Sequence, residues 1–255
     1  MGRLRGVLSR QGERAAVWLL VVAVVAASAV LLYFGTPLHG TDSGVQSVTA
    51  DDRLDVTETD GTYVLRPAEA DSDTGLVFYP GGRVHPDAYL RTLAPLVREA
   101  NVTVAVVRMP LNLAVFDQNA ADDVVDRETA VDRWYVGGHS LGGAMACRYA
   151  GENTDRVEGL VLFGSYCDRS VADTDLRVLS VTGDADTVID RETLDANADN
   201  LPADATVRRL DGVNHSQFGD YRGQPGDQPS GTTYAVAHDR LATVTVPWFG
   251  NATAD

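Results

Sequence analysis

The residues with the clearest chemical meaning form the run Gly138-His139-Ser140-Leu141-Gly142, which directly follows the short apolar run Trp134-Tyr135-Val136. This is the G-x-S-x-G pattern of a nucleophile elbow, in which a serine stands on a sharp turn between a strand and a helix. Side chains at positions 138 and 142 should collide with neighbouring segments, which explains the glycines. The helix that begins at the turn leaves backbone N–H groups free to face a reacting atom. The pattern predicts Ser140 as a nucleophile.

A serine nucleophile needs a base that takes its proton, usually a histidine oriented by a carboxylate. His215 follows a strand candidate near the C-terminus, within Gly212-Val213-Asn214-His215-Ser216, and we predict it as the base. The alternative is a structural loop histidine. The other four histidines are His39 in a linker, His85 in an early loop, His139 within the elbow, where it should point away from the serine, and His238 on the last helix.

The acid should lie between the serine and the histidine, in the loop at 182–188 that follows an apolar run. Two carboxylates compete there, Asp184 and Asp186. Asp186 stands three residues beyond the glycine that ends the strand, which leaves the loop room to turn back toward the histidine. We therefore predict Asp186 as the acid, while Asp190 is expected to be a surface or helix-start residue.

The reaction intermediate needs two N–H donors for its oxyanion. One should be Leu141, the residue after the nucleophile, and the other should come from the loop Pro80-Gly81-Gly82-Arg83. Glycine lets this backbone approach a substrate closely. We predict Gly82 as the second donor, with Arg83 as the alternative. An ordinary Gly-Gly turn would explain the glycines but not their position.

These residues need a scaffold, and the apolar pattern indicates one. Short apolar runs, typical of buried strands, alternate with helical stretches, which indicates a mostly parallel sheet covered by helices on both faces. Ligands of such sheets bind at the carboxyl ends of the strands. The expected strands cover residues 76–79, 102–107, 134–136, 160–163, 178–181 and 206–210, after a hairpin at 54–65, and the clearest helices cover 141–150, 191–200 and 234–244.

Four pieces of the sequence together resemble the α/β-hydrolase superfamily, in particular its small members without a lid, often described as dienelactone-hydrolase-like. They are Tyr79-Pro80-Gly81-Gly82, Gly138-His139-Ser140-Leu141-Gly142, Gly183-Asp184-Ala185-Asp186 and Asn214-His215. The resemblance covers residues 75–241. It implies an α/β-hydrolase fold with Ser140, Asp186 and His215 as nucleophile, acid and base, and no cofactor. Dienelactone hydrolases typically use cysteine as nucleophile, so the serine here favours an ester or another acyl substrate.

Residues 165–175, between two expected strands, are too few for a lid domain. We therefore expect an open site that accepts small or accessible, including lipid-like, esters. Two alternatives remain at this point: an acyltransferase that uses the same triad, and a non-catalytic binding module of the same fold.

Residues 15–34 carry no charge and would form a helix about 30 Å long, enough to span a bilayer core. The preceding residues 1–14 are basic, with arginines at positions 3, 5, 10 and 14. The positive-inside rule therefore predicts a cytoplasmic N-terminus and a catalytic domain outside the cell membrane. The alternative is a cleaved signal peptide, because Ala27-Ser28-Ala29 resembles a cleavage site, although the apolar run continues beyond it. Residues 35–52 are expected to form a flexible linker, and 53–250 the hydrolase domain.

The net charge of −15 excludes nucleic acid as an expected partner. All 21 basic residues are arginine, and Asp far outnumbers Glu, which suggests a protein adapted to high salt or, alternatively, an acidic exported protein. Neither the acidic stretches nor the histidines and cysteines show the spacing of a metal site, so no metal is predicted. Cys147 and Cys167 could pair outside a cell, but two buried free thiols are the favoured interpretation.

Overall fold

The computed structural model describes residues 2–250, with side chains described from Glu13 onward. The chain divides into two compact units, Met1–Thr36 and Pro37–Asp255. The predicted membrane segment therefore belongs to one unit, and every residue predicted to act in catalysis belongs to the other.

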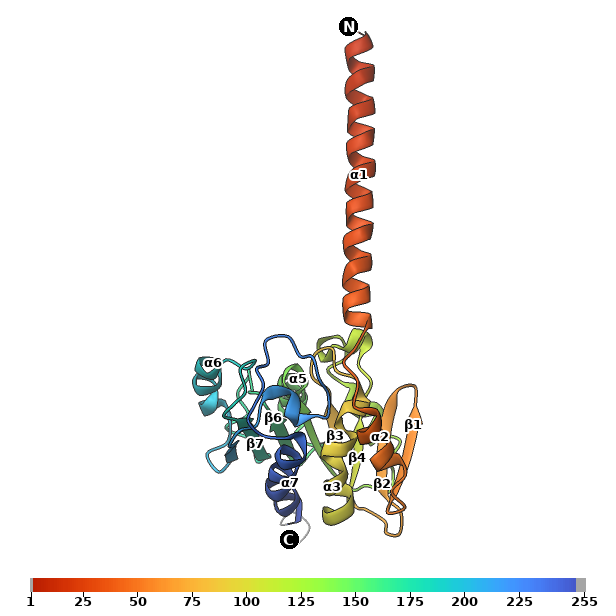
Figure 1. Cartoon of the computed structure of the whole chain (residues 1–255). Coiled ribbons are helices and arrows are strands. Elements are labelled where there is room, and N and C mark those ends of the chain that lie inside the picture. Colours follow the sequence, from red (N-terminus) through yellow and green to blue (C-terminus); the bar gives the residue numbers. More distant parts are fainter. Residues whose placement is uncertain (1, 251–255) are drawn as a thin grey trace. The chain divides into compact units, whose positions relative to one another are not determined.

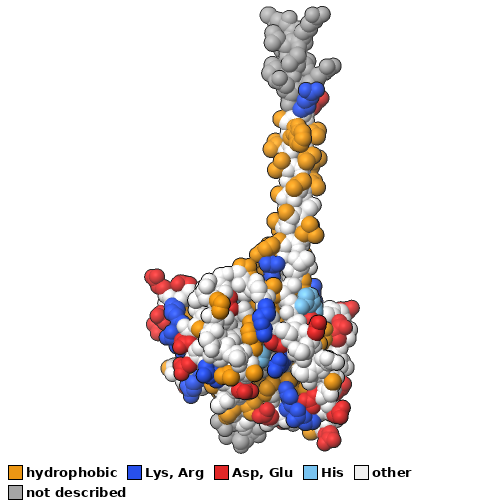
Figure 2. Space-filling model, viewed as in Figure 1, with side chains coloured by type: hydrophobic (Ala, Val, Ile, Leu, Met, Phe, Trp, Pro, Cys, Tyr) orange, Lys and Arg blue, Asp and Glu red, His pale blue; other side chains and the backbone are white. Residues whose placement is uncertain are grey.

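The first unit contains a single helix, α1 (Gly2–Gly35). Its stretch Glu13–Gly35 is long and apolar enough to cross a membrane, and hydrophobic side chains line it in Figure 2. Length and composition do not separate an anchor from a signal sequence. The helix is therefore a candidate membrane anchor, and the side chains of Arg3, Arg5 and Arg10, which carry the orientation prediction, lie outside the described residues.

The second unit is built around a sheet with the strand order β1-β2-β4-β3-β5-β6-β7-β8 (Figure 1). The strands are β1 (Leu54–Thr59), β2 (Thr62–Pro67), β3 (Thr74–Tyr79), β4 (Val102–Val106), β5 (Arg133–His139), β6 (Gly159–Phe163), β7 (Arg177–Gly183) and β8 (Thr206–Leu210). The β1–β2 and β2–β4 pairs are antiparallel, and all the other pairs are parallel. The prediction of a mostly parallel sheet is confirmed.

Helices cover both faces of this sheet because successive side chains of a strand point to opposite faces. On β3, Leu76 and Phe78 join a core with α2, α3 and α7, whereas Val77 and Tyr79 join a second core with α4 and α5. The helices are α2 (Asp42–Thr49), α3 (Leu90–Ala100), α4 (Ala120–Val125), α5 (Leu141–Glu152), α6 (Arg191–Ala196) and α7 (Tyr234–Gly250). Short 3-10 turns are η1 (Pro86–Tyr89), η2 (Pro110–Asn112), η3 (Ala114–Phe116), η4 (Ala198–Asn200) and η5 (His215–Phe218).

The prediction of a flexible linker over residues 35–52 is wrong. Leu38 pairs with Val84 in a short parallel bridge, and α2 follows, with its first turn capped by the Thr41 hydroxyl. Val48 is buried in the core that also contains α3. The segment is polar in composition, but one apolar face of it packs against the domain, and this contact is enough to hold the segment in place.

The register of the parallel strands brings their carboxyl ends to one edge of the sheet. Tyr79 of β3 lies opposite Gly138 of β5, and His139 of β5 lies opposite Phe163 of β6. The ends of β7 and β8 continue this line, with Gly183 opposite Leu210. The loops that leave these strands contain each of the predicted catalytic residues, so the edge is the candidate site.

Candidate active site

The elbow serine is held in an unusual backbone conformation. Ser140 has φ 52° and ψ −124°, a region that residues other than glycine seldom adopt. Its N–H donates to the carbonyl of Phe163 (3.0 Å), and its carbonyl accepts from the Ser165 hydroxyl (2.7 Å). Strain of this kind persists only where the surroundings enforce it. Contacts from the end of β6 and the loop after it thus fix the serine at the start of α5.

The flanking glycines are required by close backbone contacts. A Cβ atom at Gly138 would lie 2.5 Å from the carbonyl carbon of Gly142, and one at Gly142 would lie 2.2 Å from the carbonyl oxygen of Tyr79. Real Cβ atoms essentially never come this close to another heavy atom. The steric reason predicted for both glycines therefore holds.

Asp186 and His215 meet although they are distant in the sequence. Nδ1 of His215, at the start of η5, lies 2.8 Å from Oδ2 of Asp186, in the loop after β7. The other carboxylate oxygen accepts the N–H groups of Val188 (2.9 Å) and Ile189 (3.1 Å). Both residues of the pair are buried, with 4% and 1% of their surface exposed. Because Asp186 accepts the Nδ1 proton, Nε2 of His215 is left free to act as a base.

The competing carboxylate, Asp184, is engaged elsewhere. It accepts a hydrogen bond from the N–H of Gly212, and Arg191 donates to its backbone carbonyl. These contacts tie the loop after β7 to the turn after β8. Asp184 therefore has a structural role, and the structure pairs His215 with Asp186.

His139 brings the elbow close to the segment of His215. The ring of His139 packs against the ring of His215, with centroids 4.3 Å apart, and Ser140 is the next residue along the chain. No hydrogen bond joins the Ser140 hydroxyl to His215 among the described residues. Catalytic hydrogen bonds are often formed only when substrate binds.

The two predicted oxyanion donors belong to adjoining residues. A Cβ atom at Gly82 would lie 3.5 Å from Cδ2 of Leu141, an ordinary contact distance. The alternative donor, Arg83, already gives its N–H to the carbonyl of Asn112 (2.8 Å). Leu141 is the first residue of α5, so its N–H has no acceptor within the helix. The geometry therefore favours Gly82 over Arg83.

A buried network beneath the site was not predicted from the sequence. The N–H of Gly81 donates to the Tyr89 hydroxyl (2.9 Å), which lies 2.9 Å from Nδ1 of His139. Burial, followed by the influence of His215, holds the pKa of His139 well below its usual value, so the ring is neutral. The Tyr89 hydroxyl thereby connects the Gly81-Gly82 loop to the elbow. His139 is buried and its ring packs against that of His215, whereas no local sequence signal links it to Tyr89.

Comparisons with known proteins identify the family and the fold. The family model described as "Alpha/beta hydrolase family" matches residues 75–238. The chain belongs to the alpha/beta hydrolase family. The predicted fold and the prediction of a hydrolase are both confirmed. A comparison with curated proteins found no match.

Solved structures similar to this hydrolase share its fold at low sequence identity. A proposed lipase from Acinetobacter baumannii has a TM-score of 0.58 at 14% identity, with 83% of this chain and 96% of that chain covered. A predicted CIB-like hydrolase from Thermoplasma acidophilum has a TM-score of 0.52 at 14% identity, with 78% and 97% covered. Est1E from Butyrivibrio proteoclasticus has a TM-score of 0.52 at 13% identity, with 76% and 98% covered.

The hydrolase has only a short connection where a lid would insert. Residues 164–176, between β6 and β7, contain no helix or strand. A disulfide joins Cys167 of this connection to Cys147 of α5, with Cα atoms 5.5 Å apart. The favoured interpretation of two free thiols is therefore wrong. The partners lie on neighbouring elements that the linear sequence does not show to be adjacent.

An apolar rim lies beside the loop that contains Gly82, the predicted oxyanion donor. Leu113 would contact a Cβ atom at Gly82 (3.6 Å), and the turn η3 packs on α5. Leu111, Val115 and Phe116 leave 40–59% of their surface exposed.

Among the described residues, the group that could hold a metal ion consists of His39, His85 and Asp87, and it includes none of the predicted catalytic residues.

Proposed function

We propose that this chain is a serine esterase in which Ser140, His215 and Asp186 form the catalytic triad. The observation that carries the proposal is the buried hydrogen bond between His215 and Asp186, formed beside a serine that stands at a strained strand–helix turn. Family membership supports the reaction class, and the geometry supports the residues.

In the proposed reaction, the Ser140 hydroxyl oxygen bonds to the acyl carbon while Nε2 of His215 takes its proton. The carbonyl electrons move to the oxygen, where the N–H groups of Gly82 and Leu141 stabilise the negative charge. The C–O bond to the alcohol then breaks, and His215 returns the proton to the departing oxygen. Water then attacks the acyl carbon while His215 takes its proton, the bond from this carbon to the Ser140 oxygen breaks, and His215 returns the proton to that oxygen, which releases the acid and restores Ser140.

We infer that the substrate is an ester whose acyl group is small or accessible, and that lipid-like chains can reach the site. The short connection at residues 164–176 leaves the carboxyl edge of the sheet without a lid, and the exposed rim of Leu111, Val115 and Phe116 offers an apolar surface for an acyl chain. The names of the similar structures, a proposed lipase and Est1E, agree with this class.

The triad is tested by labelling the full chain with a fluorophosphonate, which reacts with an activated serine. We expect labelling of the native chain, complete loss in Ser140→Ala, and a fall in ester hydrolysis of at least about 10⁴-fold. Ser170→Ala is a matched control because Ser170 is an exposed loop serine outside the site. Equal labelling of the native and Ser140→Ala chains would overturn the assignment.

We further propose that α1 anchors the hydrolase in the cell membrane with the domain on the outer side. The arginines before the span favour a cytoplasmic N-terminus, and the Cys147–Cys167 disulfide is typical of an oxidising compartment. Protease added to intact cells should remove the domain and leave α1 protected. Protection of the domain in intact cells, followed by digestion after lysis, would contradict this orientation.

The acidic surface leads us to propose adaptation to high salt. At a net charge of −15, repulsion between carboxylates opposes the compact state, and salt screens it. Thermal unfolding followed across a salt titration should show stability rising with salt. A melting temperature that is unchanged in dilute buffer would contradict the proposal.

A further inference from the structure

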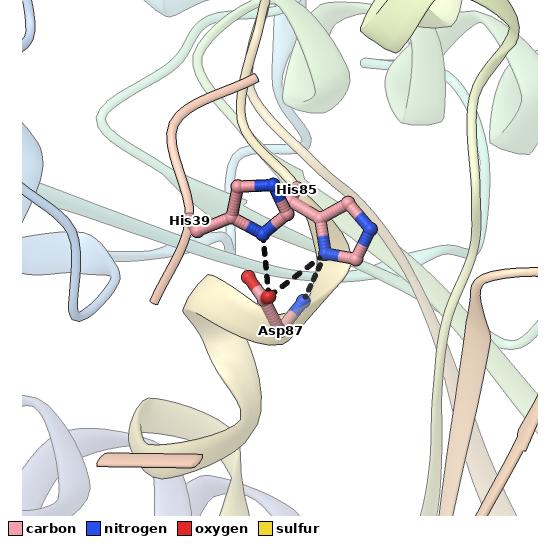
Figure 3. A group of neighbouring side chains, drawn as sticks. All are labelled: His39, His85 and Asp87. Atoms are coloured by element: carbon pink, nitrogen blue, oxygen red, sulfur yellow. Dashed lines mark hydrogen bonds and ion pairs between the residues drawn. The ribbon is translucent and has the colours of Figure 1, made fainter. Parts of the chain in front are cut away.

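Two histidines and an aspartate from distant parts of the sequence converge on one point of the domain (Figure 3). His39 lies in the extended segment after Pro37, and it is 48 residues from Asp87. His85 and Asp87 lie in the loop after β3 and in η1. The hydrogen bonds Leu38 N–H to Arg83 carbonyl (2.6 Å) and His85 N–H to Leu38 carbonyl (2.8 Å) align the two segments. The cluster is thus held by backbone pairing.

The potential ligand atoms all face the same volume. Nδ1 of His39 lies 2.7 Å from Oδ2 of Asp87, and Nδ1 of His85 lies 3.1 Å from the same oxygen. All three atoms lie within 4.8 Å of one another, and the two rings are tilted by 31° with centroids 4.3 Å apart. A tetrahedral zinc site with bonds near 2.1 Å separates its ligand atoms by about 3.4 Å, so small side-chain movements would accommodate an ion.

The carboxylate is prepared for this role by its other contacts. The N–H of Gly40 donates to Oδ1 of Asp87 (2.8 Å), which leaves Oδ2 directed at the histidines. Burial opposes ionisation of Asp87, but hydrogen bonds from His85, Gly40 and His39 outweigh it and hold the pKa of the carboxyl below its usual value. Asp87 is therefore a carboxylate at neutral pH, as a metal ligand must be.

The contacts of His85 direct its Nδ1 atom at Asp87. This nitrogen lies 3.3 Å from the backbone nitrogen of Asp87 and 3.1 Å from Oδ2 of its carboxylate. Nδ1 of His39 approaches the same oxygen from the other segment, at 2.7 Å. One metal ion would satisfy both nitrogens and the oxygen at once.

We propose that His39, His85 and Asp87 bind one divalent transition-metal ion, with Zn²⁺ as the expected ion and water at the remaining positions. Imidazole nitrogen and carboxylate oxygen together suit Zn²⁺, whereas Mg²⁺ and Ca²⁺ prefer oxygen ligands alone. His39 leaves 55% of its side chain exposed, against 15% and 13% for His85 and Asp87, so an ion can enter from the His39 side. The bound ion would tie the segment after Pro37 to the loop that follows Gly82.

The site is tested by titrating Zn²⁺ into the full chain in detergent, after removal of metal with EDTA, and measuring binding against a chromophoric chelator. We expect one equivalent of Zn²⁺ per chain at neutral pH, with little competition from Mg²⁺. Removal of a supporting residue typically weakens a metal site 10–100-fold, so His39→Ala, which deletes a direct ligand, should weaken binding by at least about 100-fold. His85→Ala should give a similar loss.

Two controls separate a built site from general attraction to the acidic surface. Asp60→Asn removes one charge from the exposed β1–β2 turn and should leave Zn²⁺ binding unchanged, whereas Asp87→Asn should abolish it. Ester hydrolysis and circular dichroism confirm that each variant is folded. The proposal is overturned if the native chain binds Zn²⁺ no better than His39→Ala, or if Asp60→Asn weakens binding as much as Asp87→Asn does.

Discussion

Two pairs of histidine rings in this hydrolase have the same centroid separation, 4.3 Å, and each pair lies beside one aspartate. In the first pair, His139 and His215 are buried, and Asp186 is hydrogen-bonded to the ring of His215. In the second pair, His39 is exposed, and both histidines direct Nδ1 at the same oxygen of Asp87. The residue types are identical, but the number of nitrogens facing the carboxylate differs.

That difference decides which chemistry each pair can perform. In the buried pair every Nδ1 atom has its own partner, Asp186 for His215 and Tyr89 for His139. In the proposed mechanism, this separates the nitrogen of His215 that faces Asp186 from the nitrogen that acts as the base. In the exposed pair the convergence of two nitrogens on one oxygen favours a shared cation. The partner of each ring nitrogen thus indicates function better than the presence of the residue does.

The largest expected effect comes from exchanging one histidine of each pair for glutamine. His215→Gln removes the proposed base and should lower kcat for a p-nitrophenyl ester by about 10⁴-fold or more. His85→Gln should change kcat by less than about twofold, because its ring contacts neither Ser140 nor His215. Steady-state kinetics of both variants, with circular dichroism as the folding control, provides the measurement. Similar losses in both variants would remove the functional distinction between the pairs.

A smaller effect is expected from the network that supports the buried pair. Tyr89→Phe leaves the Gly81 N–H and His139 Nδ1 without their shared partner, which should loosen the oxyanion loop. Loss of a direct oxyanion donor costs 10²–10³-fold in kcat, so we expect about tenfold here, with KM changed by less than about twofold. Steady-state kinetics with a short-chain ester separates the two parameters.

Tyr79→Phe is the matched control for this experiment. The Tyr79 hydroxyl is also buried in a two-bond contact, donating to the Gln118 carbonyl (2.7 Å) and accepting from the Ala121 N–H (3.0 Å), but it contacts neither His139 nor His215. The Tyr79→Phe variant should lose about as much stability as Tyr89→Phe does but keep the kcat of the native chain. Equal kcat losses in both variants would reduce Tyr89 to a general packing role.

The contrast between the pairs also shows how much of the fold and of the site could be predicted from the sequence. Strands could be predicted because apolar runs alternate with turn residues, and the position of Asp186 followed from the length of one loop. The partners of His39 and Tyr89 could not be predicted, because they lie 48 and 50 residues away and no periodic pattern links them. The pairing of Cys147 with Cys167 likewise depends on how α5 packs against the loop after β6. Contacts within one element are local, whereas contacts between elements need the fold.

Two buried histidines, His139 and His238, should also make the hydrolase sensitive to acid. Burial lowers the pKa of His139 well below 6.5 and also lowers the pKa of His238 below 6.5. As the pH falls, the unfolded chain therefore binds protons at a higher pH than the folded chain does. Their contribution to stability is complete above pH 6.5 and is lost as the pH falls toward the folded pKa values, by up to about 1.4 kcal/mol per pH unit for each group. Asp51, with a pKa of about 2, acts only at lower pH.

Urea unfolding of the full chain between pH 7.5 and about pH 5 measures this slope. His139→Phe should reduce the slope, because it removes one of the two histidines whose pKa is lowered by burial. Tyr79→Phe removes no group that changes charge in this pH range and should leave the slope unchanged. An unchanged slope in His139→Phe would contradict the prediction.

The smallest effect, and the sharpest separation of the pairs, is expected from chelation. If the exposed pair binds Zn²⁺ and the buried pair performs catalysis, EDTA should lower the melting temperature of the native chain, because the ion binds only the folded state. The value of kcat should change by less than about twofold, since neither His39 nor His85 supplies a group to the acyl intermediate. His39→Ala should melt at the same temperature with and without EDTA. A loss of kcat on chelation that Zn²⁺ restores would instead show that the metal orders the loop containing Gly82, through the backbone bonds that join Leu38 to Arg83 and His85.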